Sequence, residues 1–276
     1  MKIYPKISAG ELHEKMKEII AESEGIEIQF FNQNGITAEF DFETEVRKRK
    51  KEFPNLKEIV IHPPLSDYNI ELLMLKDEKI VENQWKTIVK LSEDLDISIS
   101  FVYHTCMSKK QFISTNLDAR IKRLLNIVEN TNTTILIENL FMMLDERIGC
   151  EALEICKYMN HPNLRMCLDT THMHCKSHIW KMNFDEMLER DLSNEDCSNY
   201  VKQVHFAATL NNDGYVDKEH THGRRHPDKA SLQEEVKWLE KYGLKEKIFV
   251  TEVSENDYYS RVDQIKEIEM LKELGK

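Results

Sequence analysis

The sequence predicts an α/β protein folded as a single (β/α)8 TIM barrel. Short apolar, β-branched runs alternate with longer amphipathic runs, which is typical of parallel strands joined by crossover helices. Eight such units follow one another along 276 residues, close to the ~250 residues usual for this barrel. No glycine-rich nucleotide-binding turn follows an early strand, which weakens the alternative of an open, doubly wound sheet.

The expected strands are short apolar runs bounded by polar segments. They are Lys2–Ser8, Ile26–Phe31, Glu58–His62, Ile97–His104, Thr134–Glu138, Leu164–Asp169, Val201–Phe206 and Lys247–Glu252. The amphipathic runs between them predict helices near residues 10–23, 39–52, 78–94, 115–130, 147–159, 184–191, 230–241 and 257–274. No boundary signal divides the chain, so residues 1–276 are expected to form one domain.

Composition excludes several classes of protein. With a formal net charge of −11, the chain lacks the broad positive field that captures nucleic acid or an anionic membrane, although metal ions can reverse the sign inside one cleft. No apolar run approaches the ~18 residues of a membrane helix. The N-terminus also lacks a signal-peptide core, so we expect a cytoplasmic protein without a membrane partner. The oligomeric state stays open.

Six of the eight expected strands end in a residue that can bind a metal ion. These residues are His62 ("EIVIH"), His104 ("ISISFVYH"), Glu138 ("TTILIE"), Asp169 ("RMCLD"), His205 ("VKQVH") and Glu252 ("KIFVTE"). In a TIM barrel the carboxyl ends of all strands meet at one mouth, where active sites lie. We therefore expect the six side chains to converge in one cleft.

Each of these residues has an ordinary explanation when it is taken alone. A carboxylate at a strand end can cap the next helix, and a single buried histidine is usually a hydrogen-bonded core residue. Together, three imidazoles and three carboxylates in one cleft would suffer repulsion and desolvation unless cations neutralised them. The sequence therefore predicts one to three divalent metal ions per chain, with zinc favoured by the histidines and manganese, cobalt or magnesium as alternatives.

Two neighbouring segments add candidates. His172 follows Asp169 by three residues, in an expected strand-to-helix loop, and should reach the same cleft as a further candidate metal ligand. The segment "DGYVDKEHTHGRRH" follows the seventh strand, and an exposed polar loop is the competing interpretation of it. Its candidate ligands are Asp217, Glu219, His220, His222 and His226.

These residues resemble the xylose isomerase-like barrels, a family that includes endonuclease IV and many sugar isomerases and epimerases. The similarity covers the whole barrel and is most specific in "ILIEN", "CLDTTH", "VHF" and "VTE". The resemblance implies that His172 is the histidine of the family's Asp-x-x-His motif. It also implies a shared metal quartet of Glu138, Asp169, His205 and Glu252.

Endonuclease IV adds a trinuclear zinc site to this pattern. Its two additional histidines correspond to His62 and His104. Its Asp-x-His pair after strand seven corresponds in spacing to His220 and His222. Counting back from the following glycine gives Asp217 and Glu219 instead, and the sequence leaves both registers open.

The segments that face DNA in endonuclease IV differ in this chain. They read "HTCMS" after the fourth strand, "ENLFMMLDE" after the fifth and "AATLNND" after the seventh, and Leu65 stands in place of a tyrosine. The metal-binding residues are thus kept while the expected DNA-facing loops are changed.

The favoured function is isomerisation or epimerisation of a small sugar or sugar phosphate. The metal would act as a Lewis acid on adjacent hydroxyl and carbonyl oxygens. Glu138 and Glu252 are the expected catalytic carboxylates that move a proton beside the carbonyl, and His172 would orient a substrate oxygen. Arg224 or Arg225 would bind a substrate phosphate or carboxylate, with plain surface charge as the alternative.

Two other functions stay open. A zinc phosphodiesterase that cleaves abasic-site DNA, as an AP endonuclease does, would use two or three ions to stabilise the attacking and leaving oxygens. A non-catalytic metal-binding barrel is the third hypothesis. The fold alone does not separate the three.

Overall fold

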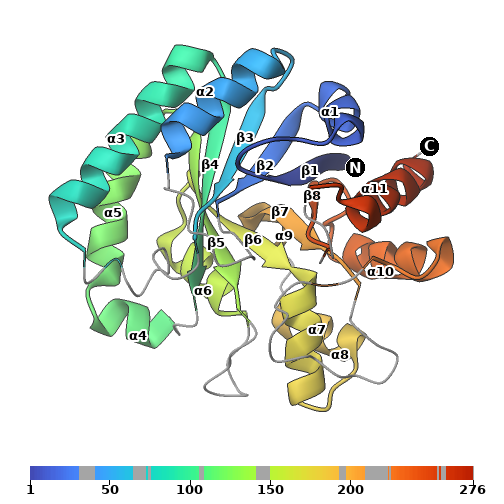
Figure 1. Cartoon of the computed structure of the whole chain (residues 1–276). Helices are drawn as coiled ribbons and strands as arrows, with labels where there is room; N and C mark the ends of the chain where they lie inside the picture. The colour runs from blue at the N-terminus through green and yellow to red at the C-terminus, as the bar shows by residue number, and fades with distance from the viewer. Residues whose placement is uncertain are drawn as a thin grey trace.

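Eight parallel strands form the centre of the computed structural model, which describes residues 1–30, 41–64, 73, 76–105, 109–140, 150–192, 197–208, 223, 225–253, 255 and 259–275. The strands are β1 (Lys2–Ser8), β2 (Gly25–Gln29), β3 (Glu58–His62), β4 (Ser98–Thr105), β5 (Thr133–Asn139), β6 (Leu164–Asp169), β7 (Val201–Phe206) and β8 (Ile248–Thr251). They pair in sequence order, and β1 also pairs with β8 (Figure 1). The predicted (β/α)8 barrel is therefore confirmed.

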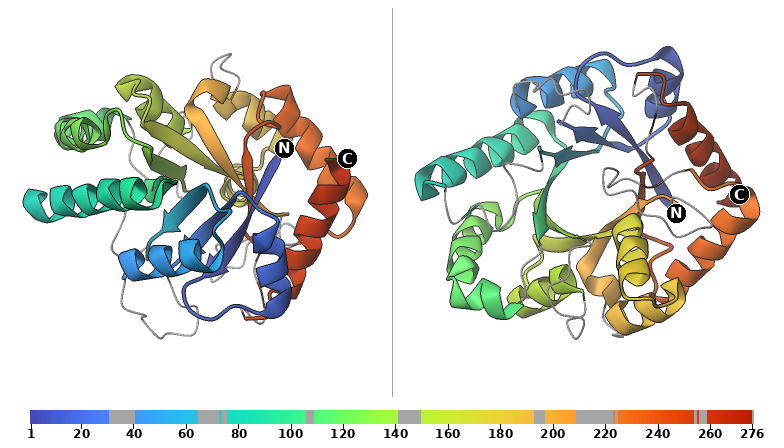
Figure 2. Two further views of the ribbon diagram at one scale, coloured as in Figure 1. Left: turned by 90° about the horizontal axis from the view of Figure 1, so that it is seen from above. Right: turned by 60° about the horizontal axis from the view of Figure 1, so that its bottom comes forward.

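Helices surround this ring of strands (Figure 2). They are α1 (Glu14–Ala21), α2 (Phe42–Glu52), α3 (Glu78–Leu95), α4 (Lys109–Ser114), α5 (Leu117–Val128), α6 (Glu151–Met159), α7 (Thr170–Ile179), α8 (Phe184–Leu192), α9 (Cys197–Tyr200), α10 (Lys229–Lys241) and α11 (Val262–Leu274). The last helix, α11, packs against the first strand, β1, so the two ends of the chain lie close together.

Helix α7 corrects the expected loop after the sixth strand. The chain turns into a helix directly at Thr170, and the reason is local. The Asp169 carboxylate Oδ1 accepts a hydrogen bond from the backbone N–H of His172 at 2.7 Å. A side chain that satisfies an N–H of the first turn is a helix N-cap. His172 is therefore presented by a helix rather than by a loop.

Alternation along the strands decides which side chains enter the barrel. Val60, Val102 and Leu136 form a buried cluster at the barrel interior. Successive even-numbered residues of a strand share one face. The residues two positions later therefore also point inward. They are His62 at the end of β3 and, one residue before the ends of β4 and β5, His104 and Glu138.

The outer face of β4 packs against the apolar side of an amphipathic helix, α3. Trp85 of α3 is fully buried against Phe101 and Tyr103, and its indole N–H donates to the Tyr103 hydroxyl at 3.1 Å. Burial of aromatic side chains on one face fixes the register of the strand. The opposite face, which carries His104, is thereby directed into the barrel.

A separate polar cluster closes the barrel where the strands begin. Lys202 Nζ lies 2.7 Å from Glu58 Oε1 and donates to the hydroxyls of Ser100 at 2.8 Å and Thr134 at 3.2 Å. The Tyr4 hydroxyl donates to the other Glu58 oxygen at 3.2 Å. Because these residues lie near the amino ends of their strands, their role is expected to be stability rather than chemistry.

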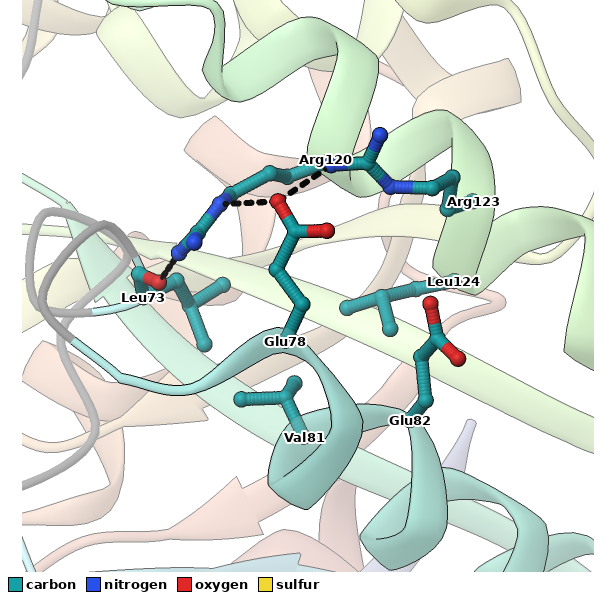
Figure 3. A pocket seen from close by; sticks show the side chains of 7 residues that line it. All are labelled: Leu73, Glu78, Val81, Glu82, Arg120, Arg123 and Leu124. Carbon is teal, nitrogen blue, oxygen red and sulfur yellow. Dashed lines mark hydrogen bonds and ion pairs between the residues drawn. The ribbon is translucent and has the colours of Figure 1, made fainter.

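The outer helical layer carries a small groove between α3 and α5 (Figure 3). Leu73, Val81 and Leu124 form its apolar part. Arg120 and Arg123 both reach Glu78, at 3.1 and 2.5 Å, so their charges are already paired. Its lining residues come from the outer helices and from Leu73, and none of them belongs to a strand.

The prediction that no segment spans a membrane can be compared with the described ranges. No helix in them is long and apolar enough to cross a membrane. Their cysteines are buried and form no disulfide; these are Cys150, Cys156, Cys167, Cys175 and Cys197.

Candidate metal centre

Glu138 lies at the centre of the predicted cluster. Its Oε2 atom is 3.6 Å from His62 Nε2, 3.4 Å from His104 Nε2 and 3.2 Å from His205 Nδ1. Glu138 is 1% exposed, and Oε2 makes no hydrogen bond within the described part of the chain. A buried carboxylate oxygen that faces three imidazole nitrogens without bonding to them is an arrangement that suits a cation between them.

Two more carboxylates approach the same nitrogen of His205 that faces Glu138. This Nδ1 atom lies 2.6 Å from Glu252 Oε2 and 3.9 Å from Asp169 Oδ2. Strand register explains why Asp169 lies close to His205, because the two residues are direct partners across β6 and β7. On β4 and β5, His104 pairs in the same way with Glu138.

Four donor sets in this region could hold a divalent ion. Two of them take in a residue that the sequence argument did not single out, which is Glu27 in one and Cys167 in the other, and the remaining two consist of predicted residues alone. Glu138, Asp169, His205 and Glu252 offer ligand atoms that all lie within 4.8 Å of one another, and so do His62, His104 and Glu138. These last two sets share Glu138. Mixed imidazole nitrogen and carboxylate oxygen donors suit zinc and also manganese or cobalt. The described residues therefore fit one or two adjacent metal ions.

His172 enters the cluster from the first turn of α7. Its Nδ1 donates to the backbone carbonyl of Asn139 at 2.7 Å and lies 3.5 Å from Glu138 Oε1. The Asn139 side chain in turn clamps Asp169, since its amide donates to the Asp169 carbonyl at 3.2 Å and its oxygen accepts from the Asp169 N–H at 2.9 Å. These bonds fix Asp169 and His172 relative to Glu138.

The electrostatics of the cluster depend on burial and on its mixed charges. Burial and the Lys6 ammonium lower the pKa of His62 to about 4, which keeps this imidazole neutral and able to bind a metal. Burial, Glu252 and Glu138 raise the pKa of Asp169 well above its usual range. Burial opposes the ionised form of Glu138, but His104 and His205 outweigh it and hold its pKa well below the usual range.

A buried polar layer lies beneath the cluster, and the sequence argument missed it. Lys6 Nζ lies 2.5 Å from Glu252 Oε1 and 2.9 Å from Glu27 Oε1. Glu27 Oε2 accepts from the Gln203 amide at 2.9 Å and lies 2.8 Å from His205 Nε2. The available signal was a charged residue between two isoleucines in "GIEIQ", a strand in which every residue is buried.

Several predicted site residues cannot be compared with this geometry. His220, His222, Asp217, Glu219 and Arg224 lie outside the described residues. Their assignment as loop ligands and as a substrate-binding arginine therefore stays a prediction.

Arg225 is described, and it contacts helix α11. Its Nε lies 3.3 Å from Asp263 Oδ1, and its Nη1 donates to the carbonyl of His226 at 2.9 Å. Neither contact involves a residue of the metal-binding cluster, so its substrate role also stays a prediction.

His226 forms a separate network between helices. Its Nε2 lies 3.1 Å from Glu235 Oε2, and the same oxygen lies 3.2 Å from His174 Nε2. The other ring nitrogen of His226 bonds to Glu267, and its ring stacks on Phe206. This network joins α7, α10 and α11, and it explains why His226 is buried rather than part of an exposed loop.

The His226 network should make stability depend on pH. Burial opposes the charged form, but Glu235 and Glu267 raise the pKa of His226 to about 9. Protonated His226 therefore stabilises the folded state. This stabilisation is complete below the pKa of a histidine in the unfolded chain, ~6.5, and it is lost as the pH rises through about 9. We expect His226→Gln to destabilise the protein by on the order of 3 kcal/mol at pH 6 and by clearly less at pH 10. Denaturant unfolding of both proteins at the two pH values measures this, and an equal loss at both would contradict it.

A family model described as a xylose isomerase-like TIM barrel matches residues 20–274. The chain belongs to the xylose isomerase-like TIM barrel family. No curated protein matches the sequence. The predicted resemblance to this family is thus confirmed.

Solved structures show the same fold at low sequence identity. A D-tagatose 3-epimerase-like protein is 18% identical, with a TM-score of 0.63 over 99% of this chain and 96% of the other. An IolI protein with a bound zinc atom is 14% identical, with a TM-score of 0.62 over 100% and 96%. Endonuclease IV from Thermus thermophilus is 14% identical, with a TM-score of 0.57 over 99% and 100%. An epimerase-like protein and an endonuclease therefore share the barrel, and the fold alone does not choose between their functions.

Proposed function

We propose that this member of the family is a divalent-metal-dependent isomerase or epimerase that acts on a small sugar or sugar phosphate. The observation that carries the proposal is the quartet of Glu138, Asp169, His205 and Glu252 at the mouth of the barrel, with ligand atoms all within 4.8 Å of one another. Among structures with this fold, one is a D-allulose 3-epimerase in complex with D-allulose and one is a 3-keto-D-glucoside 4-epimerase.

The bound metal would supply a Lewis acid that polarises the substrate carbonyl. Glu138 and Glu252 come from β5 and from the end of β8, and each approaches His205 Nδ1, at 3.2 and 2.6 Å. We assign to these two carboxylates the removal and return of the proton on the carbon beside the carbonyl, the step that isomerisation and epimerisation share.

We assign orientation of the substrate to His172. Because its Nδ1 donates to the Asn139 carbonyl, its ring is fixed, and the other nitrogen, Nε2, is the one that would meet a substrate oxygen. A phosphate or carboxylate on the substrate would be bound by Arg224 or Arg225, as the sequence predicts.

A second candidate function is favoured by one specific observation. His62, His104 and Glu138 form a further donor set next to the quartet, which a single-ion isomerase does not require. Two or three zinc ions held side by side are typical of phosphodiester hydrolysis. A zinc phosphodiesterase that acts on abasic-site DNA is therefore the alternative, against which the net charge of −11 is adverse.

Elemental analysis of the purified protein, before and after mild chelation and reloading, separates these functions. We expect one or two exchangeable ions per chain, manganese, cobalt or zinc, and turnover in a screen of small ketoses, aldoses and their phosphates. About three zinc ions per chain, with cleavage of an abasic-site duplex, would replace the isomerase proposal by the alternative. Absence of any bound metal after reloading would refute the metal centre and both functions with it.

A further inference from the structure

Glu27 lies in a closed ring of four buried groups beneath the quartet. Lys6 Nζ contacts Glu27 Oε1 at 2.9 Å and Glu252 Oε1 at 2.5 Å. His205 completes the ring, because its Nε2 lies 2.8 Å from Glu27 Oε2 and its Nδ1 lies 2.6 Å from Glu252 Oε2. All four side chains are at most 4% exposed. The ring therefore joins two expected metal ligands, His205 and Glu252, to two residues that hold no place in the ligand set proposed above.

Within the ring, the two oxygens of each carboxylate contact different partners. Glu27 uses one oxygen for Lys6 and the other for His205, and Glu252 uses Oε1 for Lys6 while Oε2 faces the His205 ring. An imidazole whose Nε2–H donates to a carboxylate presents an unprotonated Nδ1 when it binds a metal. That Nδ1 is the atom that also faces Glu138 Oε2, at 3.2 Å.

We propose that Glu27, held in place by Lys6, is a positioning residue that fixes the ring of His205 so that Nδ1 faces the metal site. The inference rests on the proposed metal centre and adds to it a residue that the ligand quartet does not contain. Register supports the assignment, since Lys6 and Glu27 are direct partners across β1 and β2. Carboxylates that orient metal-binding histidines typically change metal affinity by 10–100-fold when they are replaced.

The chain offers a matched control at the other end of the barrel. Glu58 is also a glutamate that enters the barrel from a strand and pairs with a lysine, Lys202, at 2.7 Å. It bonds to Ser100 and Tyr4 and to none of the quartet residues in the contacts that the structure describes. Glu58→Gln therefore repeats the loss of one carboxylate charge in the barrel without touching His205.

The test compares the dissociation constant for Zn²⁺, measured by competition with a chelating dye, in the wild type, Glu27→Gln, Glu27→Asp and Glu58→Gln. We expect both Glu27 variants to raise the constant at least tenfold, because aspartate keeps the charge but is too short to reach His205 Nε2. The dissociation constant of Glu58→Gln should stay within about twofold of the wild-type value, because Glu58 makes no contact with the metal ligands that the structure describes.

Each other outcome has a defined meaning. If Glu27→Asp binds zinc like the wild type while Glu27→Gln does not, charge alone matters and the positioning role is overturned. Unchanged affinity in both variants, or an equal loss in Glu58→Gln, overturns it as well. If the wild type itself binds no metal, the proposed metal centre fails first. That failure is visible without any variant.

Nitrogen-15 NMR of the zinc-loaded protein gives a second readout that a structural role would not move. The wild type should show His205 protonated at Nε2 and not at Nδ1, with the resonance assigned from a His205→Gln sample. Protonation at Nδ1 in the loaded wild type would overturn the inference. Glu27→Asp should alter this resonance, whereas Glu58→Gln should leave it unchanged.

Discussion

Glu138→Gln is expected to remove metal binding from the protein, raising the dissociation constant for zinc or manganese by more than about 100-fold. Glu138 belongs to both donor sets that consist of predicted residues alone, so its loss weakens each of these metal positions at once. Glutamine keeps the size of the side chain but replaces a charged oxygen donor by a neutral amide. Under the proposed function, isomerase activity should also fall by roughly 10²–10⁴-fold, the range for removal of a group that transfers a proton.

Chelator competition and elemental analysis measure this result, with Glu58→Gln as the control. The control removes an equivalent carboxylate from the barrel but should leave the metal content unchanged. Wild-type metal content and affinity in Glu138→Gln would show that the oxygen facing His62, His104 and His205 is not a ligand. The central place of Glu138 in the proposed centre would then be wrong.

Lys6→Met is expected to cause the largest loss of stability at the site, about 3–5 kcal/mol in the metal-free protein. Methionine fills a similar volume but leaves the two buried carboxylates of Glu27 and Glu252 without their shared cation. Burial alone would favour a neutral lysine, yet these two carboxylates hold the pKa of Lys6 above its usual range. The ion pairs are therefore strong in the folded state. The melting temperature should fall by on the order of 10 °C.

Thermal unfolding of the metal-free proteins measures this loss, with Lys202→Met as the comparison. Lys202 also pairs with a glutamate, but its side chain is 23% exposed and that of Lys6 is 2% exposed. Solvent screens the more exposed pair, so Lys202→Met should cost clearly less. A loss in Lys6→Met that is no larger than in Lys202→Met would contradict the role given to Lys6.

Hydrophobic pattern alone predicts most of this barrel. The strands β3, β6 and β7 are predicted with the bounds that the structure has. Short runs rich in apolar residues mark parallel strands that are buried on both faces, even where polar residues interrupt them, as Lys202 and Gln203 do in β7. Helix α7 is not predicted by the hydrophobic pattern. The segment "TTHMHCKSHI" lacks an apolar stripe of helical period, and the Asp169 carboxylate caps its first turn.

The sequence by itself determined the barrel and the set of metal-capable residues at its strand ends. Each of these residues follows directly on an apolar run, and parallel strands bring their carboxyl ends together whatever the details of packing. Only the tertiary structure decided the ring of Lys6, Glu27, Glu252 and His205. Its members come from β1, β2, β7 and the end of β8, and their partners depend on register and on which face of each strand turns inward. The local sequence does not predict such pairs, because the residues around a buried charge are the same whether or not the fold gives it a partner.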